Sequence, residues 1–134
     1  MRRLSLALAF AALVGIAGAD AQSYPTRPIT LIIPFPAGGS TDAIGRIVTE
    51  RMRASLGQPV IIENVGGAGG SIGVGRVARA APDGYTLDIG QWDTHVANGA
   101  TYPLSYDVLK DFEPVALISQ QSVADPRPED HAGR

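Results

Sequence analysis

Short apolar runs alternate along this chain with segments whose apolar residues recur every three or four positions. The run at 29–33 is β-branched and almost continuously apolar, which is typical of a strand buried on both faces. Two more short apolar runs, at 60–62 and 85–89, predict two further strands. The segments between these runs carry the helical spacing, so the pattern predicts strands and helices in alternation.

The first helical segment follows a proline- and glycine-rich loop at 34–40. Its apolar positions lie mostly three and four residues apart, which predicts one buried helical face; they are Ile44, Ile47, Val48, Met52 and Leu56. Ser40, Thr41 or Asp42 is expected to cap the start of this helix, and Gly57 is expected to end it.

The second helical segment, 72–80, follows another glycine-rich stretch at 65–70, and Ser71 is its expected cap. The resulting order, β-loop-α-β-loop-α-β, predicts an α/β fold with a parallel sheet and right-handed crossovers. Beyond residue 90 the pattern weakens. A short helix at 94–100 and a fourth strand at 115–119 are the expectations there.

The N-terminus has the three parts of a secretory leader. Arg2 and Arg3 are followed by an apolar run at 4–18 and by Ala19-Asp20-Ala21, an A-x-A cleavage site. The apolar run is shorter than the roughly 20 residues of a membrane-spanning helix. We therefore expect residues 1–21 to be a cleaved signal peptide and the mature chain to be periplasmic.

Composition excludes several classes of function. The net charge is −2, so the chain lacks the basic surplus of a nucleic-acid-binding protein. It contains no cysteine, which excludes thiolate zinc sites and cysteine nucleophiles. No spacing of ligand residues indicates a metal site, and no cofactor is expected.

Both glycine-rich loops lie between a predicted strand and a predicted helix. Ligands of open α/β sheets bind at this carboxyl edge of the strands. Glycine lets backbone N–H groups approach a ligand, and each following helix adds the positive end of its dipole. If the two strands are neighbours, the loops would direct several donors at one small anion. Tight turns without a ligand remain the alternative for either loop alone.

Nucleotide and catalytic motifs fit less well. Neither loop continues into Gly-Lys, so a Walker loop is excluded, and the G-x-G-x-x-A letters at 73–78 fall inside a predicted helix. The letters G-x-S-x-G at 69–73 match a nucleophile elbow, with Ser71 as nucleophile and His95 as candidate base. Ser71, however, lies well beyond the second strand. We therefore expect a binding protein and keep a small hydrolase-like enzyme as the alternative.

Several stretches in register resemble one family, the Bug-type receptors of tripartite tricarboxylate transporters. They read YPTRPI at 24–29, IPFPAGGSTD at 33–42, NVGGAGGSIG at 64–73, PDGYTL at 82–87 and YDVLKDFEPV at 106–115. The third is similar to the family pattern N-[RK]-x-G-A-G-G-x-x-G. Its basic residue is replaced here by Val65.

The resemblance implies a periplasmic binding protein of two lobes (type II) that captures a small carboxylate for membrane transporter subunits. Residues 22–119 would be part of the first lobe, and its loops would hold the carboxylate. The ligand-binding residues implied in this way are Phe35, Ala37, Gly38, Gly39, Ser40, Asp42, Gly67, Ala68, Gly69, Gly70, Thr94 and Asn98. Asp42 is expected to serve the loop and helix, because its charge would repel an anion.

Length is the largest departure from the family. Bug-type receptors are longer, and residues 120–134 are polar and proline-containing where the family places an apolar strand. We expect this tail to be disordered and the chain to be a truncated lobe. One lobe offers half of the contacts of a closed cleft, so weak or absent binding and marginal stability are expected. A fragment without function is the other alternative. The resemblance does not identify the carboxylate.

Overall fold

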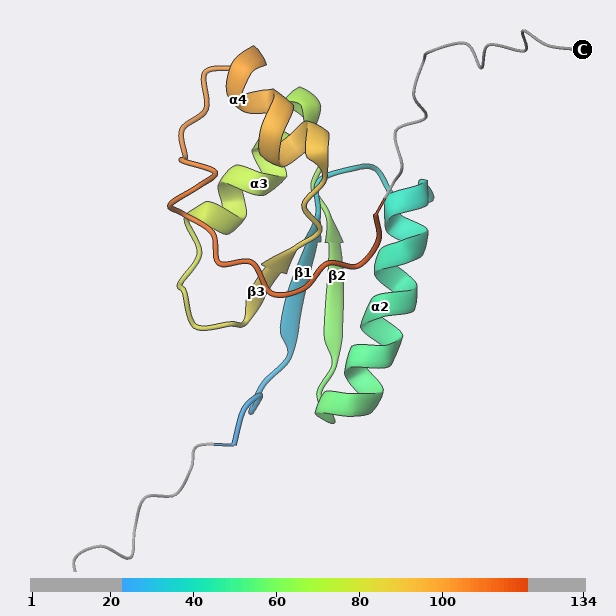
Figure 1. The fold of residues 1–134 in the computed structure, drawn as a ribbon. Coiled ribbons are helices and arrows are strands. Elements are labelled where there is room, and N and C mark those ends of the chain that lie inside the picture. Colours follow the sequence, from blue (N-terminus) through green and yellow to red (C-terminus); the bar gives the residue numbers. More distant parts are fainter. Residues whose placement is uncertain (1–22, 121–134) are drawn as a thin grey trace, which may run out of the picture.

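Three parallel strands form the centre of the computed structural model, which describes residues 23–120 (Figure 1). They are β1 (Ile29–Ile33), β2 (Val60–Asn64) and β3 (Thr86–Asp88), and their order is β2-β1-β3. Ile33 lies opposite Asn64 on β2, and Leu31 lies opposite Leu87 on β3. The predicted α/β class, the three strands and the parallel sheet are confirmed.

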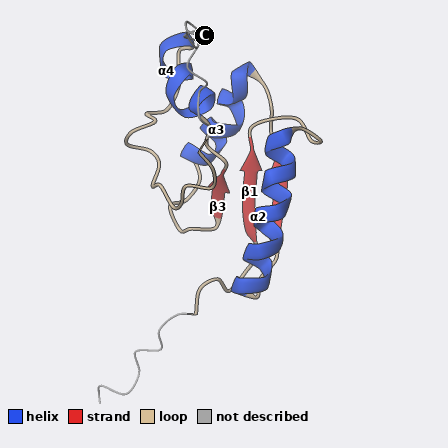
Figure 2. Cartoon of the chain, turned by 45° about the vertical axis from the view of Figure 1, so that its right-hand side comes forward, coloured by secondary structure: helices blue, strands red, loops and turns tan. Residues whose placement is uncertain are grey.

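Two helices connect these strands. Helix α2 (Ser40–Leu56) packs along β1 and β2, and α3 (Ser71–Ala78) packs along β1 and β3. The chain first moves from β1 to β2 and then returns past β1 to β3. Because crossovers between parallel strands are right-handed as a rule, this reversal places the two helices on opposite faces of the sheet. Figure 2 shows α2 in front of the strands on its side.

Strand β1 supplies most of the core because it is the central strand. Its apolar residues are at most 4% exposed, and residues from α3 and from the end of β3 join them. The buried apolar residues are Ile29, Leu31, Ile32, Ile33, Val74 and Ile89. The continuous apolar run thus has the double-sided burial that it predicts.

The expected side-chain caps are wrong. Gly39 and Gly70 hold the N-cap positions of α2 and α3, and no side chain caps either helix. Gly70 adopts a left-handed conformation with φ of 90°, which favours glycine and brings the chain into α3 without a serine cap. At the other end of α2 the prediction is confirmed, since Gly57 has φ of 68° and its N–H bonds to Arg53 O at 3.0 Å.

The expected buried face of α2 is also partly wrong. Ile44 and Ile47 are 37% and 66% exposed, whereas Gly45 and Thr49 on the neighbouring face are buried. Gly45 explains the rotation. A Cβ atom built there would lie 2.5 Å from Ile33 Cδ1, so the missing side chain lets the helix approach the sheet along this line.

Beyond β3 the chain forms a π-helical turn, η2 (Asp93–Ala97), followed directly by α4 (Asn98–Thr101). This confirms the short helix expected at 94–100. The fourth strand at 115–119 is wrong. Residues 116–119 line a hollow with the end of β3 and the first turn of α2, and cross the strands instead of pairing with them (Figure 1). Val115 and Leu117 are 79% and 82% exposed, so their apolar character does not reflect a buried strand.

The expected signal peptide, 1–21, lies outside the described residues, as does 121–134 of the expected disordered tail. Within residues 23–120, no helix combines the length and the apolar character needed to cross a membrane.

Candidate anion-binding site

The loops that follow β1 and β2 lie side by side at the carboxyl edge of the sheet. Strand β1 leads into α2 on one face, and its neighbour β2 leads into α3 on the other face. Where neighbouring strands diverge in this way, an α/β sheet has a crevice that commonly holds a ligand. The first loop is residues 35–39 and the second loop is residues 65–70. The structure thus brings together the two segments that the sequence paired.

Asn64 ties the first loop to the second. Its Nδ2 donates to Phe35 O and to Asp42 Oδ1, both at 3.1 Å. Val65 continues the contact, because its N–H donates to Ile33 O at 2.8 Å. These bonds join the end of β2 to the start of the first loop and to α2, so the two loops are held in a fixed relation.

Asp42 is the buried charge of this edge, with 3% of its surface exposed. Its Oδ2 accepts from Arg46 Nε and from Gly38 N–H, each at 2.9 Å, while Oδ1 faces Asn64. The Arg46 hydrogen bond, then those of Gly38 and Asn64, lower the pKa of Asp42 to about 2. The carboxylate is therefore ionised, and the positive charge of Arg46 balances its negative charge. Its oxygens are occupied by hydrogen bonds that hold the first loop in place.

The first loop places unbonded N–H groups at the start of α2. The amides of the first helical turn, among them Ser40 and Thr41, have no acceptor within the helix. The helix dipole adds partial positive charge at the same point. Most residues expected in this loop are exposed, namely Ala37, Gly38, Gly39 and Ser40, and Phe35 is half-buried. Solvent, and thus a solute, can reach this turn.

The second loop has an unusual backbone. Ala68, Gly69 and Gly70 follow one another with φ values of 44°, 63° and 90°. Successive residues of this kind can turn their N–H groups toward one concavity, which binds anions. Ala68 is a non-glycine residue in the left-handed region, and such strain commonly occurs at functional sites. Gly67, Ala68 and Gly69 are exposed at the tip of the loop, whereas Gly70 is buried.

Close packing explains two glycines of the second motif without a ligand. A Cβ atom on Gly70 would lie 2.6 Å from Thr94 Cγ2, and one on Gly73 would lie 2.5 Å from Val65 O. Both positions press the start of α3 against neighbouring backbone. The family resemblance implied that Gly70 contacts the ligand. In the structure Gly70 lies under the loop, against Pro34 and Thr94.

Thr94 and Asn98 also lie beneath the second loop, where they are 0% and 5% exposed. Asn98 Nδ2 donates to Gly69 O at 2.7 Å, and Thr94 Oγ1 accepts from Gln91 N–H at 3.0 Å. Asn98 thus holds the loop by a hydrogen bond, and Thr94 packs its methyl group beneath Gly70. Tyr102 also contacts Gly69, and sequence reasoning missed it. Its position one helical turn after Asn98 is the signal that could have identified it.

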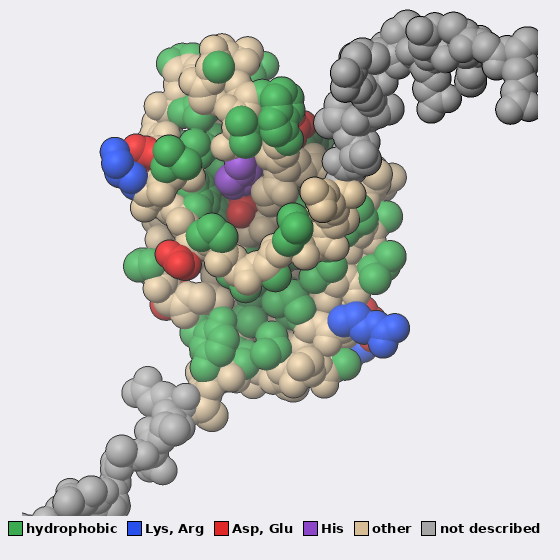
Figure 3. All heavy atoms as spheres, in the orientation of Figure 1, with side chains coloured by type: hydrophobic (Ala, Val, Ile, Leu, Met, Phe, Trp, Pro, Cys, Tyr) green, Lys and Arg blue, Asp and Glu red, His purple; other side chains and the backbone are tan. Residues whose placement is uncertain are grey.

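His95 lies in a separate polar cluster. Its Nδ1 is 2.9 Å from Thr94 Oγ1 and its Nε2 is 3.3 Å from Asp88 Oδ2, so both ring nitrogens face residues other than Ser71. Figure 3 shows a histidine side chain directly above an acidic one on this face of the molecule. Tyr106 lies nearby, and burial, then the charge of Asp88, raises the pKa of its phenol. The arrangement does not join Ser71 and His95 into a catalytic pair.

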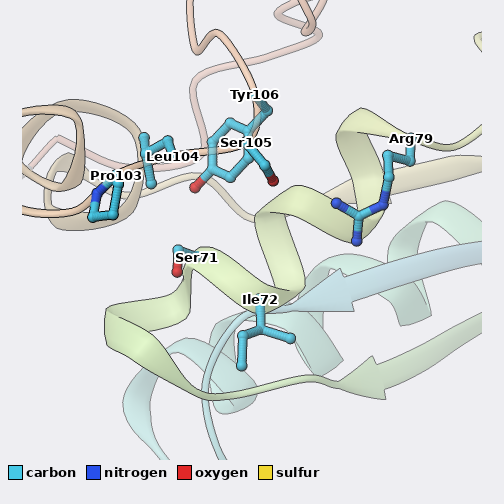
Figure 4. A pocket seen from close by; sticks show the side chains of 7 residues that line it. All are labelled: Ser71, Ile72, Arg79, Pro103, Leu104, Ser105 and Tyr106. Carbon is cyan, nitrogen blue, oxygen red and sulfur yellow. The ribbon is translucent and has the colours of Figure 1, made fainter.

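A hollow of about 220 Å³ runs between α3 and residues 103–106 (Figure 4). Its lining residues are Ser71, Ile72, Arg79, Pro103, Leu104, Ser105 and Tyr106. Figure 4 shows Ser71 and Ile72 leaving the first turn of α3 in opposite directions. Within residues 23–120, no three side chains of the metal-binding types gather into a cation site.

Comparison with known proteins gives a consistent picture. The model of the tripartite tricarboxylate transporter family receptor matches residues 44–130. Protein BugT of Bordetella pertussis is 42% identical over 120 residues, which is 87% of this chain and 37% of BugT. A UPF0065 protein of Agrobacterium vitis is 47% identical over 76% of this chain and 30% of its own length.

Solved structures agree with these relatives. MatC from Rhodopseudomonas palustris with bound malate has a TM-score of 0.68 and 50% identity, covering 71% of this chain and 33% of MatC. The R. palustris protein Rpa4515 with adipate has a TM-score of 0.53 and 40% identity, covering 54% of this chain and 24% of that protein. The chain spans about a third of the length of these curated relatives.

Proposed function

Because the chain belongs to the tripartite tricarboxylate transporter receptor family, we propose that its two glycine-rich loops bind a carboxylate group of a small solute. The observation that carries this proposal is the Asn64 bridge, which fixes the first loop and α2 beside the second loop. The N–H groups of the first turn of α2 and those of Ala68 and Gly69 then act on the same anion, while the N–H of Gly70 closes the turn on Gly67 O at 2.9 Å.

Binding, not catalysis, is the activity that this arrangement supports. The family is one of receptors, and both ring nitrogens of His95 are engaged away from Ser71. We propose that the protein acts in the periplasm and delivers its solute to membrane transporter subunits, as the family description implies. The leader-like N-terminus supports export.

The two loops contribute one wall of a site. Tight small-molecule sites bury most of their ligand among contacts from several sides. For a polypeptide of these 134 residues alone, we expect a dissociation constant of about 1 mM or weaker, near 4 kcal/mol of binding free energy. Malate and adipate, which the solved relatives contain, are the natural first probes.

Ser40 offers a sharp test because it is the first residue of α2. Proline is well tolerated at this position, and Gly39 before it is extended, with φ of −79° and ψ of 174°, as a pre-proline residue must be. Ser40→Pro therefore removes one N–H donor while preserving the helix. Ser40→Ala removes only the hydroxyl group and is the matched control.

We expect malate to bind Ser40→Pro about tenfold more weakly than the unaltered chain, because one hydrogen bond to a charged group is lost. The affinity of Ser40→Ala should stay within about threefold if the backbone donor is what matters. Affinities are measured by NMR titration, and circular dichroism checks the fold. Unchanged malate affinity in a folded Ser40→Pro variant would contradict the proposed role of the first loop.

A further inference from the structure

Two partly exposed apolar side chains border the second loop. A Cβ atom built on Gly67 would lie 2.7 Å from Ile72 Cδ1, and one built on Gly69 would lie 3.1 Å from Tyr102 Cε2. Glycine at 67 and 69 thus admits these side chains against the loop backbone. Ile72 and Tyr102 nevertheless remain 54% and 41% exposed. The proposed anion site therefore has apolar surface directly beside its donors.

The apolar margin extends toward the first loop. Gln91 Nε2 donates to Thr41 Oγ1 at 2.8 Å, which ties the segment before η2 to the first turn of α2. The next residue, Trp92, is 73% exposed, and Val96 in η2 is 59% exposed. Exposed apolar side chains thus continue along the segment that follows this tie.

Charge at the same edge is balanced. The carboxylate of Asp42 is paired with Arg46 at 2.9 Å, so this pair adds no net charge to the loops. The backbone donors then offer partial positive charge suited to one carboxylate. A hydrocarbon skeleton attached to that carboxylate would gain apolar contact with Ile72 and Tyr102, whereas a second or third carboxylate in its place would gain none.

We propose that this wall of the site selects a carboxylate whose adjoining carbon skeleton is apolar, aliphatic or aromatic, over a compact polycarboxylate. The loops hold the carboxylate, and the skeleton lies against Ile72 and Tyr102. This inference rests on the proposed function, because it assigns the rest of the solute once the loops hold its carboxylate. It narrows the class of solute from any carboxylate to an amphipathic one.

The test compares acetate, cyclohexanecarboxylate and citrate at matched ionic strength, using NMR titration of the full chain. A ring that buries about 60 Å² of apolar surface should bind about tenfold more tightly than acetate. Citrate should bind no more tightly than cyclohexanecarboxylate. Tighter binding of citrate would overturn the inference and leave the proposed function standing. If none of the three ligands shifts the loop amides, the proposed function itself fails.

Variants assign the preference to the two side chains. Tyr102→Ala and Ile72→Ala should each reduce the ratio of cyclohexanecarboxylate affinity to acetate affinity about twofold, the effect of losing about a third of that contact area. Because the ratio is taken within each variant, a general weakening of the loop cancels. Tyr102→Phe should keep the preference. Ile47→Ala, which truncates another exposed isoleucine, in α2 and away from the loops, is the matched control. An unchanged preference in both Tyr102→Ala and Ile72→Ala would refute the assignment.

Discussion

Replacing Gly73 with alanine is expected to destabilise the fold although Gly73 lies inside a helix. In a helix interior, alanine is favoured over glycine by about 1 kcal/mol. The new Cβ would lie 2.5 Å from Val65 O and 3.1 Å from Pro34 Cα, both backbone atoms at the ends of the strands. Backbone cannot rotate away as a side chain does. An overpacking cost of about 3 kcal/mol then leaves a net loss of about 2 kcal/mol.

Gly99→Ala is the matched control. Gly99 is also helical, in α4, and nothing lies within 4 Å of a Cβ atom built there. Alanine at 99 should therefore raise stability by up to about 1 kcal/mol. Thermal unfolding followed by circular dichroism should show Gly73→Ala melting about 10 °C below the unaltered chain and Gly99→Ala at or above it. If Gly73→Ala proved as stable as Gly99→Ala, the close approach of α3 to the strand ends would be refuted.

Three further outcomes are expected. Ala68→Gly should raise stability by about 1 kcal/mol in urea unfolding, because glycine removes the cost of φ of 44°; a loss of stability would argue against strain there. The folded protein lowers the pKa of Asp42 from 3.8 to about 2, so the ionised carboxylate stabilises the fold above pH 3.8. This stabilisation is lost as the pH falls from 3.8 toward about 2. The stability of Asp42→Asn should therefore depend less on pH in that window, as measured by acid unfolding. N-terminal sequencing of the exported chain should begin at Gln22, and a retained Met1 would contradict cleavage.

The strands and the paired loops could be predicted because strong local signals coincide there. The β-branched run Ile29–Ile33 has one stable environment, the centre of a parallel sheet, and each glycine-rich loop follows a strand. Once β1 and β2 are neighbours, the topology alone brings the loops to one edge. Much of the candidate site thus follows from the order of elements.

Close packing explains most of what the sequence did not predict. The face that α2 turns to the sheet is decided by the narrow approach at Gly45, which a count of apolar residues does not register. Gly70 and Gly73 look like ligand-loop residues in the motif, yet they admit neighbouring backbone and Thr94. Residues 115–119 have strand-like composition, but the segment crosses the strands instead of pairing with one of them (Figure 1).

Residue-resolved NMR titration of the full chain with malate tests the central claim most directly. The account predicts that the amides of Gly39 and Ser40 in the first turn of α2 and of Ala68 and Gly69 in the second loop shift together, along one binding curve. Amides at the far end of α2, near Leu56, should stay fixed. Shifts confined to one loop, or spread evenly over the chain, would contradict a carboxylate site shared by the two loops.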